Sequence, residues 1–233
     1  MSRGDQEVVR REFGTDERYR ARRLDRWAVY LGPDPRQHAL LAVLEACPRR
    51  VLDAGAGDGE FAEWVARRLT SDVVAVDQSA WMAGRAEERG LPARVAEIGA
   101  LPCEDAEFDV VVANWVLYFL ADLDAGLADL ARVLRPGGRL VALTNSRRHL
   151  EELWGEQPMS FDAENGAAAL ERQFARVERR DVEGSVVFPT REAVRRYVEA
   201  FSVLGTRPAV DVDGLVEPFR ATTRNAVFVA ETR

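Results

Sequence analysis

The chain has 233 residues, 47% hydrophobic and 30% charged, which supplies enough apolar material for one sizeable core. Its formal net charge is −7, with arginine interleaved among acids, which disfavours nucleic acid as a partner and favours a small molecule. Two distant cysteines, two histidines, short apolar runs and a polar N-terminus argue against a disulfide framework, a metal centre or a membrane partner, so we expect a cytoplasmic protein.

The first 18 residues are polar, and helical patterns follow them. Leu24, Trp27 and Leu31 recur at helical spacing and predict a helix over Tyr19–Leu31. The letters GPDP then interrupt the pattern, and a second helix is predicted over Gln37–Ala46.

From residue 50 onward, short apolar strands alternate with helices that carry apolar residues on one face. Strands are predicted at residues 50–54, 72–77, 93–98, 108–114 and 139–145. Helices are predicted at 59–69, 79–90 and 122–134. Because this alternation is typical of strands joined by crossover helices, it predicts an α/β fold with a doubly wound, mostly parallel sheet.

The rhythm changes after Asn145. A helix is predicted at 146–154, a loop and a helix at 157–174, and a helix at Pro189–Leu204. Strands are predicted at 175–188, bent near Gly184, and at 226–232. These two strands bring the sheet to seven, and we expect the last to be an antiparallel C-terminal edge strand.

The stretch VLDAGAGDGEF, from Val51 to Phe61, joins the first of these strands to a helix and is the leading candidate for a ligand loop. A dinucleotide fingerprint needs G-x-G-x-x-G, but its third glycine falls on Glu60. Asp58 and Glu60 would also repel a pyrophosphate. Asp77 ends the second strand and suits a ribose diol, because a carboxylate only accepts hydrogen bonds. A nucleoside with positive groups and no phosphate, such as S-adenosylmethionine, reconciles these features.

Together with this glycine loop, the whole span Arg50–Thr144 resembles a class I S-adenosylmethionine-dependent methyltransferase of the broad type 11, small-molecule group. The resemblance implies a Rossmann-like sheet and S-adenosylhomocysteine as the product. The segments that carry it are VLDAGAGDGEF, VVAVDQS, ARVAEIGALPCEDAEFDVVVANWVLYFL and LARVLRPGGRLVALTN.

The resemblance also implies how the cofactor is held. Asp53 and Asp58 would orient the ammonium, and Asp77 would hold the ribose. Glu97 departs from the family's commoner Asp, being one methylene longer, and would accept from the adenine amino group. The full implied cofactor-binding set is Asp53, Gly55, Gly57, Asp58, Asp77, Gln78, Glu97, Ile98 and Asn114.

A general base is needed only if the methyl acceptor must lose a proton. The candidates are His149, just past the fifth strand of the alternating region, and Tyr118, where related enzymes often carry histidine. Both also have plain structural interpretations, as a surface helix residue and a packing residue. His38 is interpreted as a helix-surface residue.

Residues 1–46 are expected to form an N-terminal helical cap or lid, and 47–233 the methyltransferase domain, with acceptor-site insertions in 146–222. Trp154–Phe161 is a second lid candidate. The predicted substrate pocket contains Trp115, Tyr19, Trp27 and Tyr30, although core packing would explain the same aromatic residues.

The predicted function is methyl transfer from S-adenosylmethionine to the oxygen, nitrogen or carbon of a small molecule, a bacterial natural product or metabolite. Two alternatives stay open: a methyltransferase acting on RNA or protein, and a protein that binds the cofactor without turnover. The sequence leaves the acceptor and the oligomeric state open.

Overall fold

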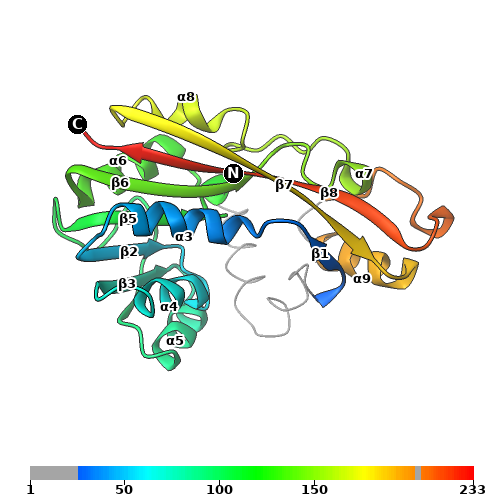
Figure 1. Ribbon diagram of the computed structural model, residues 1–233, viewed down its shortest axis with the longest axis horizontal. Helices are drawn as coiled ribbons and strands as arrows, with labels where there is room; N and C mark the ends of the chain where they lie inside the picture. Colours follow the sequence, from blue (N-terminus) through cyan, green and yellow to red (C-terminus); the bar gives the residue numbers. More distant parts are fainter. Residues whose placement is uncertain (1–25, 203–205) are drawn as a thin grey trace.

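The computed structural model describes residues 26–202 and 206–233, and in these ranges one sheet of eight strands runs through the molecule (Figure 1). The strand order is β1-β7-β8-β6-β5-β2-β3-β4. The strands are β1 (Val29–Leu31), β2 (Arg50–Ala54), β3 (Asp72–Asp77), β4 (Ala93–Val95), β5 (Phe108–Asn114), β6 (Leu134–Asn145), β7 (Arg176–Phe188) and β8 (Phe219–Glu231).

The helices lie between these strands, and none in the described ranges is long and apolar enough to cross a bilayer. The α-helices are α3 (Pro35–Glu45), α4 (Glu60–Ala66), α5 (Ala80–Glu88), α6 (Leu123–Val133), α7 (Glu151–Trp154), α8 (Gly166–Leu170) and α9 (Arg191–Ser202). Two short 3-10 turns complete the described elements, η2 (Leu117–Phe119) and η3 (Val212–Gly214).

Strands β2 to β6 run parallel, which confirms the predicted doubly wound α/β sheet. The last strand, β8, is antiparallel as predicted, but it lies inside the sheet between β6 and β7 and not at an edge. Its position follows from its composition, because Ala226–Ala230 are buried on both faces, as an interior strand requires. The predicted count of seven strands is one short, because β1 joins the sheet beside β7.

The helix predicted over Tyr19–Leu31 is wrong in its last residues. Val29–Leu31 form β1, which pairs antiparallel with β7. The edge of β7 offers unpaired backbone groups, and satisfying them outweighs a local helical spacing. Residues 19–25 lie outside the described residues. The next helix, α3, starts where Asp34 accepts a hydrogen bond from the Arg36 amide at 2.9 Å.

Apolar clusters on the two faces of the sheet hold the helices in place. Helices α3, α4 and α5 cover one face, where Val43, Val65 and Val112 lie in a common cluster. Helices α6 and α8 cover the other face (Figure 1), where Leu130 and Leu170 lie in a second cluster. The sheet is therefore buried on both sides through its parallel part.

Strands β7 and β8 continue past the end of β6. Asn145 pairs with Asn225 in the last β6–β8 position, and from there β8 pairs with β7 alone. Figure 1 shows β1, α7 and α9 gathered at this end. A third apolar cluster, which includes Trp154, Phe188 and Tyr197, holds the extension together.

The helix predicted at 146–154 is shorter in the structure. It forms only over Glu151–Trp154, after Leu150 in a left-handed conformation with φ 53°. His149 therefore precedes α7 instead of lying on a helix surface.

Candidate functional site

Three polar side chains stand at the carboxyl ends of neighbouring parallel strands: Asp53 on β2, Asp77 on β3 and Asn114 on β5. Since side chains alternate between the faces of a strand, each lies on the same face as the residue two positions before it. Those residues all belong to the cluster beneath α3, α4 and α5; they are Val51, Ala75 and Val112. We call Asp77, Asp53 and Asn114 the polar row. It lies where open α/β sheets bind ligands.

The glycine loop after β2 is bent onto the end of β3. Gly55 and Gly57 have φ of +76° and +56°, a region that other residues rarely adopt. The Gly55 amide donates to the Val76 carbonyl at 2.7 Å, and the Gly57 amide donates to the Asp77 carboxylate at 2.9 Å. A Cβ on Gly55 would lie 2.5 Å from Val116, whereas one on Gly57 would meet no described atom within 4 Å. The backbone at Gly57 is therefore open to a ligand.

Asp53 is the more deeply buried carboxyl group of the row. It is 2% exposed, and burial, followed by the charge of Asp77, raises its pKa to about 7. Its buried Oδ2 has no hydrogen-bond partner among the described residues. A cation placed beside Asp53 would stabilise the charged carboxylate, so this position suits a positively charged ligand.

Asp77 is held rigidly at the end of β3. Its two carboxylate oxygens accept from the amides of Gly57 and Ser79, each at 2.9 Å. Burial raises its pKa, and these two amides oppose that shift. Each oxygen has a second lone pair, so the carboxylate retains the capacity to accept from two hydroxyl groups.

Asn114 completes the row and is followed by a strained residue. Neither polar atom of the buried Asn114 amide has a hydrogen-bond partner among the described residues. Trp115 has φ 51°, and its indole N–H donates to Asn145 Oδ1 at 2.9 Å. Unpaired buried amides and strained backbone both concentrate at functional sites. Trp115 thus lies at the border between the row and β6.

Asp58 points elsewhere. Its carboxylate pairs with the Arg89 guanidinium at 3.0 Å, and its backbone carbonyl accepts from Arg89 Nε at 2.8 Å. Arg89 also bonds Glu63 at 2.8 Å. The structure therefore gives Asp58 a bracing contact between the glycine loop and the end of α5, and does not bring it into the polar row. Sequence reasoning missed Arg89, because its partner lies 31 positions earlier in the chain.

The residues predicted to contact the adenine follow strands β3 and β4 in the chain. Gln78 is half-buried, Glu97 is exposed and Ile98 packs partly on the core cluster of the α6 face. The loop that carries Glu97 and Ile98 is held by Asp129 of α6, which accepts from the amides of Gly99 at 3.0 Å and Leu101 at 2.8 Å. Sequence reasoning also missed the role of Asp129. The sequence carried only a weak signal of it, an acid directly before the buried Leu130.

Neither predicted base has the pKa of an activated base. Burial lowers the pKa of His149 to about 4, and its Nδ1 lies 3.0 Å from the carbonyl oxygen of Arg224. Burial, followed by the influence of Tyr197, raises the pKa of Tyr118 well above its usual value. At neutral pH the imidazole is neutral and weakly basic, and the phenol keeps its proton.

Of the remaining predicted pocket residues, Trp27 and Tyr30 lie on the extension. Trp27 packs on the third apolar cluster, and the Tyr30 hydroxyl shares a hydrogen bond with Thr223 at 3.1 Å. Tyr19 lies outside the described residues. These aromatic residues come together away from the glycine loop, toward β7 and β8.

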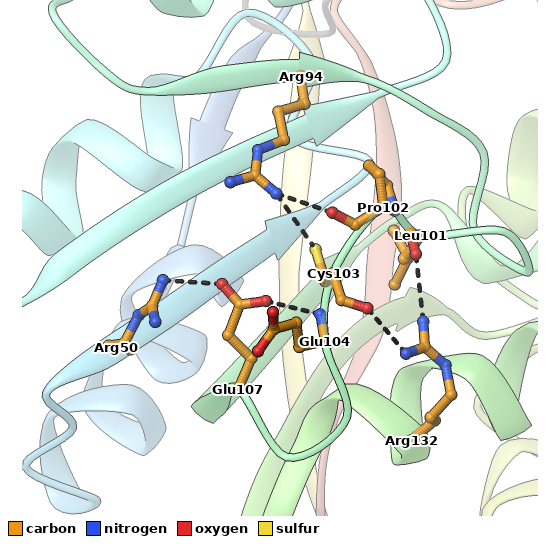
Figure 2. A pocket seen from close by; sticks show the side chains of 8 residues that line it. All are labelled: Arg50, Arg94, Leu101, Pro102, Cys103, Glu104, Glu107 and Arg132. Carbon is orange, nitrogen blue, oxygen red and sulfur yellow. Dashed lines mark hydrogen bonds and ion pairs between the residues drawn. The ribbon is translucent and has the colours of Figure 1, made fainter.

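A hollow of about 670 Å³ lies at the opposite edge of the sheet, where β2 and β5 begin (Figure 2). Its arginines are paired, since Arg50 bonds Glu107 and Arg132 bonds the Cys103 carbonyl. Burial raises the pKa of the Cys103 thiol, which is therefore not an activated nucleophile. The lining residues are Arg50, Arg94, Leu101, Pro102, Cys103, Glu104, Glu107 and Arg132. This hollow is distinct from the polar row.

Comparison with known proteins gives the family of the chain. A family profile described as a methyltransferase domain matches residues 52–142. An uncharacterized methyltransferase of Mycobacterium bovis is 33% identical over 177 residues, which cover 72% of this chain and 70% of the relative. The chain belongs to the class I S-adenosylmethionine-dependent methyltransferases.

The chain is also similar to a demethylmenaquinone methyltransferase of Thermus thermophilus, at 36% identity over 138 residues and 56% of either chain. It spans about half the length of the curated relatives that it matches. Among solved structures, the N-methyltransferase NodS of Bradyrhizobium japonicum, in complex with S-adenosyl-L-homocysteine, gives a TM-score of 0.60 at 18% identity. That match covers 98% of this chain and 99% of the other, and it shows a shared fold.

The methyl donor of the family, S-adenosylmethionine, fits the polar row of this chain. The donor carries a sulfonium and an α-ammonium, and the row offers the buried Asp53 carboxylate with an oxygen that no described residue bonds. The ribose diol matches Asp77, whose oxygens can accept further hydrogen bonds. The open backbone at Gly57 lies beside Asp77, to which its amide donates a hydrogen bond.

Proposed function

We propose that this methyltransferase transfers the methyl group of S-adenosylmethionine to a small-molecule acceptor. The attacking atom of the acceptor forms a bond to the methyl carbon as the carbon–sulfur bond breaks, and S-adenosylhomocysteine leaves. One observation carries the proposal: a buried, incompletely bonded carboxylate, Asp53, stands beside a glycine loop. This arrangement favours a cation and disfavours the pyrophosphate of a dinucleotide.

The polar row supports specific roles in binding the donor. Asp53 and Asn114 would hold the α-ammonium, and Asp77 would accept from the ribose diol. Gly55 and Gly57 would contact the methionine portion through backbone. The side chains proposed around the adenine are Gln78, Glu97 and Ile98.

The acceptor site is proposed on the β6 side of the row, with insertions in residues 146–222 contributing to it and Trp115 at its border. Relatives named for demethylmenaquinone and for malonyl-[acyl-carrier protein] both match this chain, so the likeness leaves the methylated atom open. A bacterial metabolite or natural product is the proposed acceptor class. The pKa values of His149 and Tyr118 favour an acceptor that needs no strong protein base.

Calorimetry tests the donor site directly. S-adenosylmethionine should bind, and NAD should bind far more weakly. The Asp77→Asn variant should lose affinity on the order of tenfold or more, because a hydrogen bond to a charged group contributes about 1.5–3 kcal/mol. Asp72→Asn, an exposed position at the amino end of the same strand, is the matched control and should bind normally. Equal affinity for NAD, or an unaffected Asp77→Asn variant, would contradict the proposal.

The two alternative functions, methylation of a macromolecule and cofactor binding without turnover, would each give a different experimental result. A macromolecular methyltransferase would be retained on RNA at moderate salt, which the net charge of −7 opposes. A protein that binds the donor without turnover would bind S-adenosylmethionine yet form no S-adenosylhomocysteine with any acceptor.

A further inference from the structure

The polar row continues past Asn114 onto the next two strands. Asn145 ends the parallel part of β6, and Asn225 stands directly opposite it on β8. Their same-face neighbours two positions away, Leu143 and Val227, belong to the cluster beneath α3, α4 and α5. Asn145 and Asn225 therefore project on the same face as the polar row, at the same edge of the sheet.

Asn225 is the unusual member of this continuation. It is 4% exposed, and its buried Oδ1 has no hydrogen-bond partner within residues 26–202 and 206–233. Buried side-chain amides in folded proteins are nearly always bonded, because they lose water on burial. An unbonded one at the ligand edge of a sheet indicates a partner that binds there.

The groups around Asn225 are already bonded to one another. Asn145 Oδ1 accepts from the Trp115 indole at 2.9 Å. Thr223, two positions before Asn225 on the same face of β8, bonds the Tyr30 hydroxyl at 3.1 Å. These contacts engage polar atoms beside Asn225 and leave its Oδ1 for another molecule.

A glycine makes room for this arrangement. Gly184 of β7 pairs with Thr223, and a Cβ there would lie 3.0 Å from the Thr223 hydroxyl and 3.5 Å from the Tyr30 hydroxyl. A glycine inside a strand often marks such a close approach. Tyr30 thus reaches across β7 to β8 next to Asn225.

We infer that Asn225 binds the methyl acceptor, through a hydroxyl or amide group that both donates and accepts hydrogen bonds. The inference rests on the proposed function, since it places the acceptor beside the donor site. An amide offers a carbonyl and an NH₂ group, so the match holds whichever way the Asn225 side chain is turned. Asn225 lies on β8, separated by β6 from the strands that carry the row, which assigns it to the acceptor rather than to the donor.

The test uses the full chain saturated with S-adenosylhomocysteine and probes matched in shape. Benzyl alcohol and benzamide carry the required group, and ethylbenzene lacks it. Ligand-observed NMR should show that the polar probes bind the wild type about tenfold more tightly than they bind Asn225→Leu, since the variant loses about two hydrogen bonds. Ethylbenzene should bind both proteins alike.

Thr222→Val is the matched control, because Thr222 precedes Thr223 on the opposite face of β8 and bonds Glu152. It should leave the preference for polar probes unchanged. If Asn225→Leu does not fold, Asn225→Ala, which only removes atoms, gives the same readout. A wild type that binds ethylbenzene as well as the polar probes, or an Asn225 variant that keeps the preference, overturns the inference.

Binding of S-adenosylhomocysteine, measured by calorimetry for each protein, tests the proposed function separately from the acceptor role of Asn225. Retained affinity in the Asn225 variants with loss of the polar preference supports the acceptor role. A wild type that fails to bind S-adenosylhomocysteine refutes the proposed function itself. Loss of that affinity in Asn225→Leu and Asn225→Ala alone would assign Asn225 to the donor site and overturn the inference.

Discussion

Polar side chains without partners mark the ligand edge of this protein at the level of single residues. Asp53, Asn114 and Asn225 each have a buried polar atom that no described residue bonds. Elsewhere in the fold, buried acids are fully engaged: Asp129, for example, accepts from two backbone amides and from Arg132. A native chain tolerates unbonded buried groups chiefly where a ligand completes them.

Asp53 should couple donor binding to proton release. Burial raises its pKa to about 7, so near neutral pH about half of the ligand-free molecules carry a proton there. A cationic ligand stabilises the charged carboxylate and lowers that pKa. Binding of S-adenosylmethionine should then release a fraction of a proton at pH 7, and affinity should rise as the pH increases from 6 to 8.

Calorimetry in two buffers of different ionisation enthalpy measures this proton directly. The Asp53→Asn variant cannot release it, and its affinity should vary little between pH 6 and 8. Equal heats in both buffers for the wild type at pH 7 would show that Asp53 does not change its protonation on binding.

Gly55 and Gly57 should respond differently to the same substitution. Both are left-handed, so alanine strains either position by about 1–2 kcal/mol. At Gly55 the added methyl group also meets Val116, and overpacking should lower the free energy of unfolding by about 1–3 kcal/mol more. At Gly57 the methyl group has space within the protein and should instead obstruct the donor.

Urea unfolding and calorimetry separate these outcomes. Gly55→Ala should lose about 1–3 kcal/mol more stability than Gly57→Ala, whereas Gly57→Ala should lose affinity for S-adenosylmethionine with only the backbone strain as its stability loss. Similar stability losses in both variants would mean that the contact with Val116 is relieved without cost.

At the level of secondary-structure elements, one acid ties helix α6 to the loop that carries Ile98. Asp129 of α6 accepts from the amides of Gly99 and Leu101, and it also pairs with Arg132 at 2.8 Å. Asp129→Ala would leave both amides without this acceptor. The free energy of unfolding should fall by about 2 kcal/mol or more, because buried donors lose their partner. The loop that carries Ile98 should loosen, and donor affinity should fall with it.

Asp124→Ala is the matched control for this helix. Asp124 is exposed and pairs with Arg172 on the surface, where an ion pair contributes little. The stability and donor affinity of the Asp124→Ala variant should stay near those of the wild type. Tight donor binding by Asp129→Ala would show that the loop is held by other contacts.

The whole molecule consists of a sheet buried on both faces and an extension with an apolar cluster of its own. Phe188 and Phe228 are both fully buried, but Phe188 lies in the extension and Phe228 in the cluster beneath α6 and α8. Replacement by alanine removes about 3–5 kcal/mol of stabilisation at either position. The consequences should differ, since β8 pairs with β6 at Phe228 and only with β7 near Phe188.

Hydrogen exchange should locate the difference. Phe188→Ala should speed exchange in 185–188 and 219–222 while β2 and β5 keep their protection and the donor still binds. Phe228→Ala should speed exchange across the sheet and weaken donor binding. Uniform loss of protection in Phe188→Ala would show that the extension does not open on its own.

Local sequence patterns were sufficient to predict the strands and helices of the parallel half of the molecule. The alternation over residues 50–145 predicts β2 to β6, because a strand buried on both faces and a helix with one apolar side each leave a recognisable spacing. Gly55, Gly57 and Asp77 were likewise readable, since a left-handed loop before a helix and an acid at a strand end are local features. The strand pairing beyond Asn145 could not be predicted from local patterns, because the antiparallel partners there come from distant segments.

The amino-acid sequence alone determined the fold class, the family and the residues proposed around the donor, because these depend on neighbours within a few positions along the chain. Only the tertiary structure decided where β1 and β8 lie, that Asp58 faces Arg89, and that Asn225 stands unbonded beside Asn145. Those facts arise from burial and from pairing between distant segments, such as Asn145 and Asn225, which are 80 positions apart. Burial of this kind also moves the pKa of Asp53, which no local pattern records.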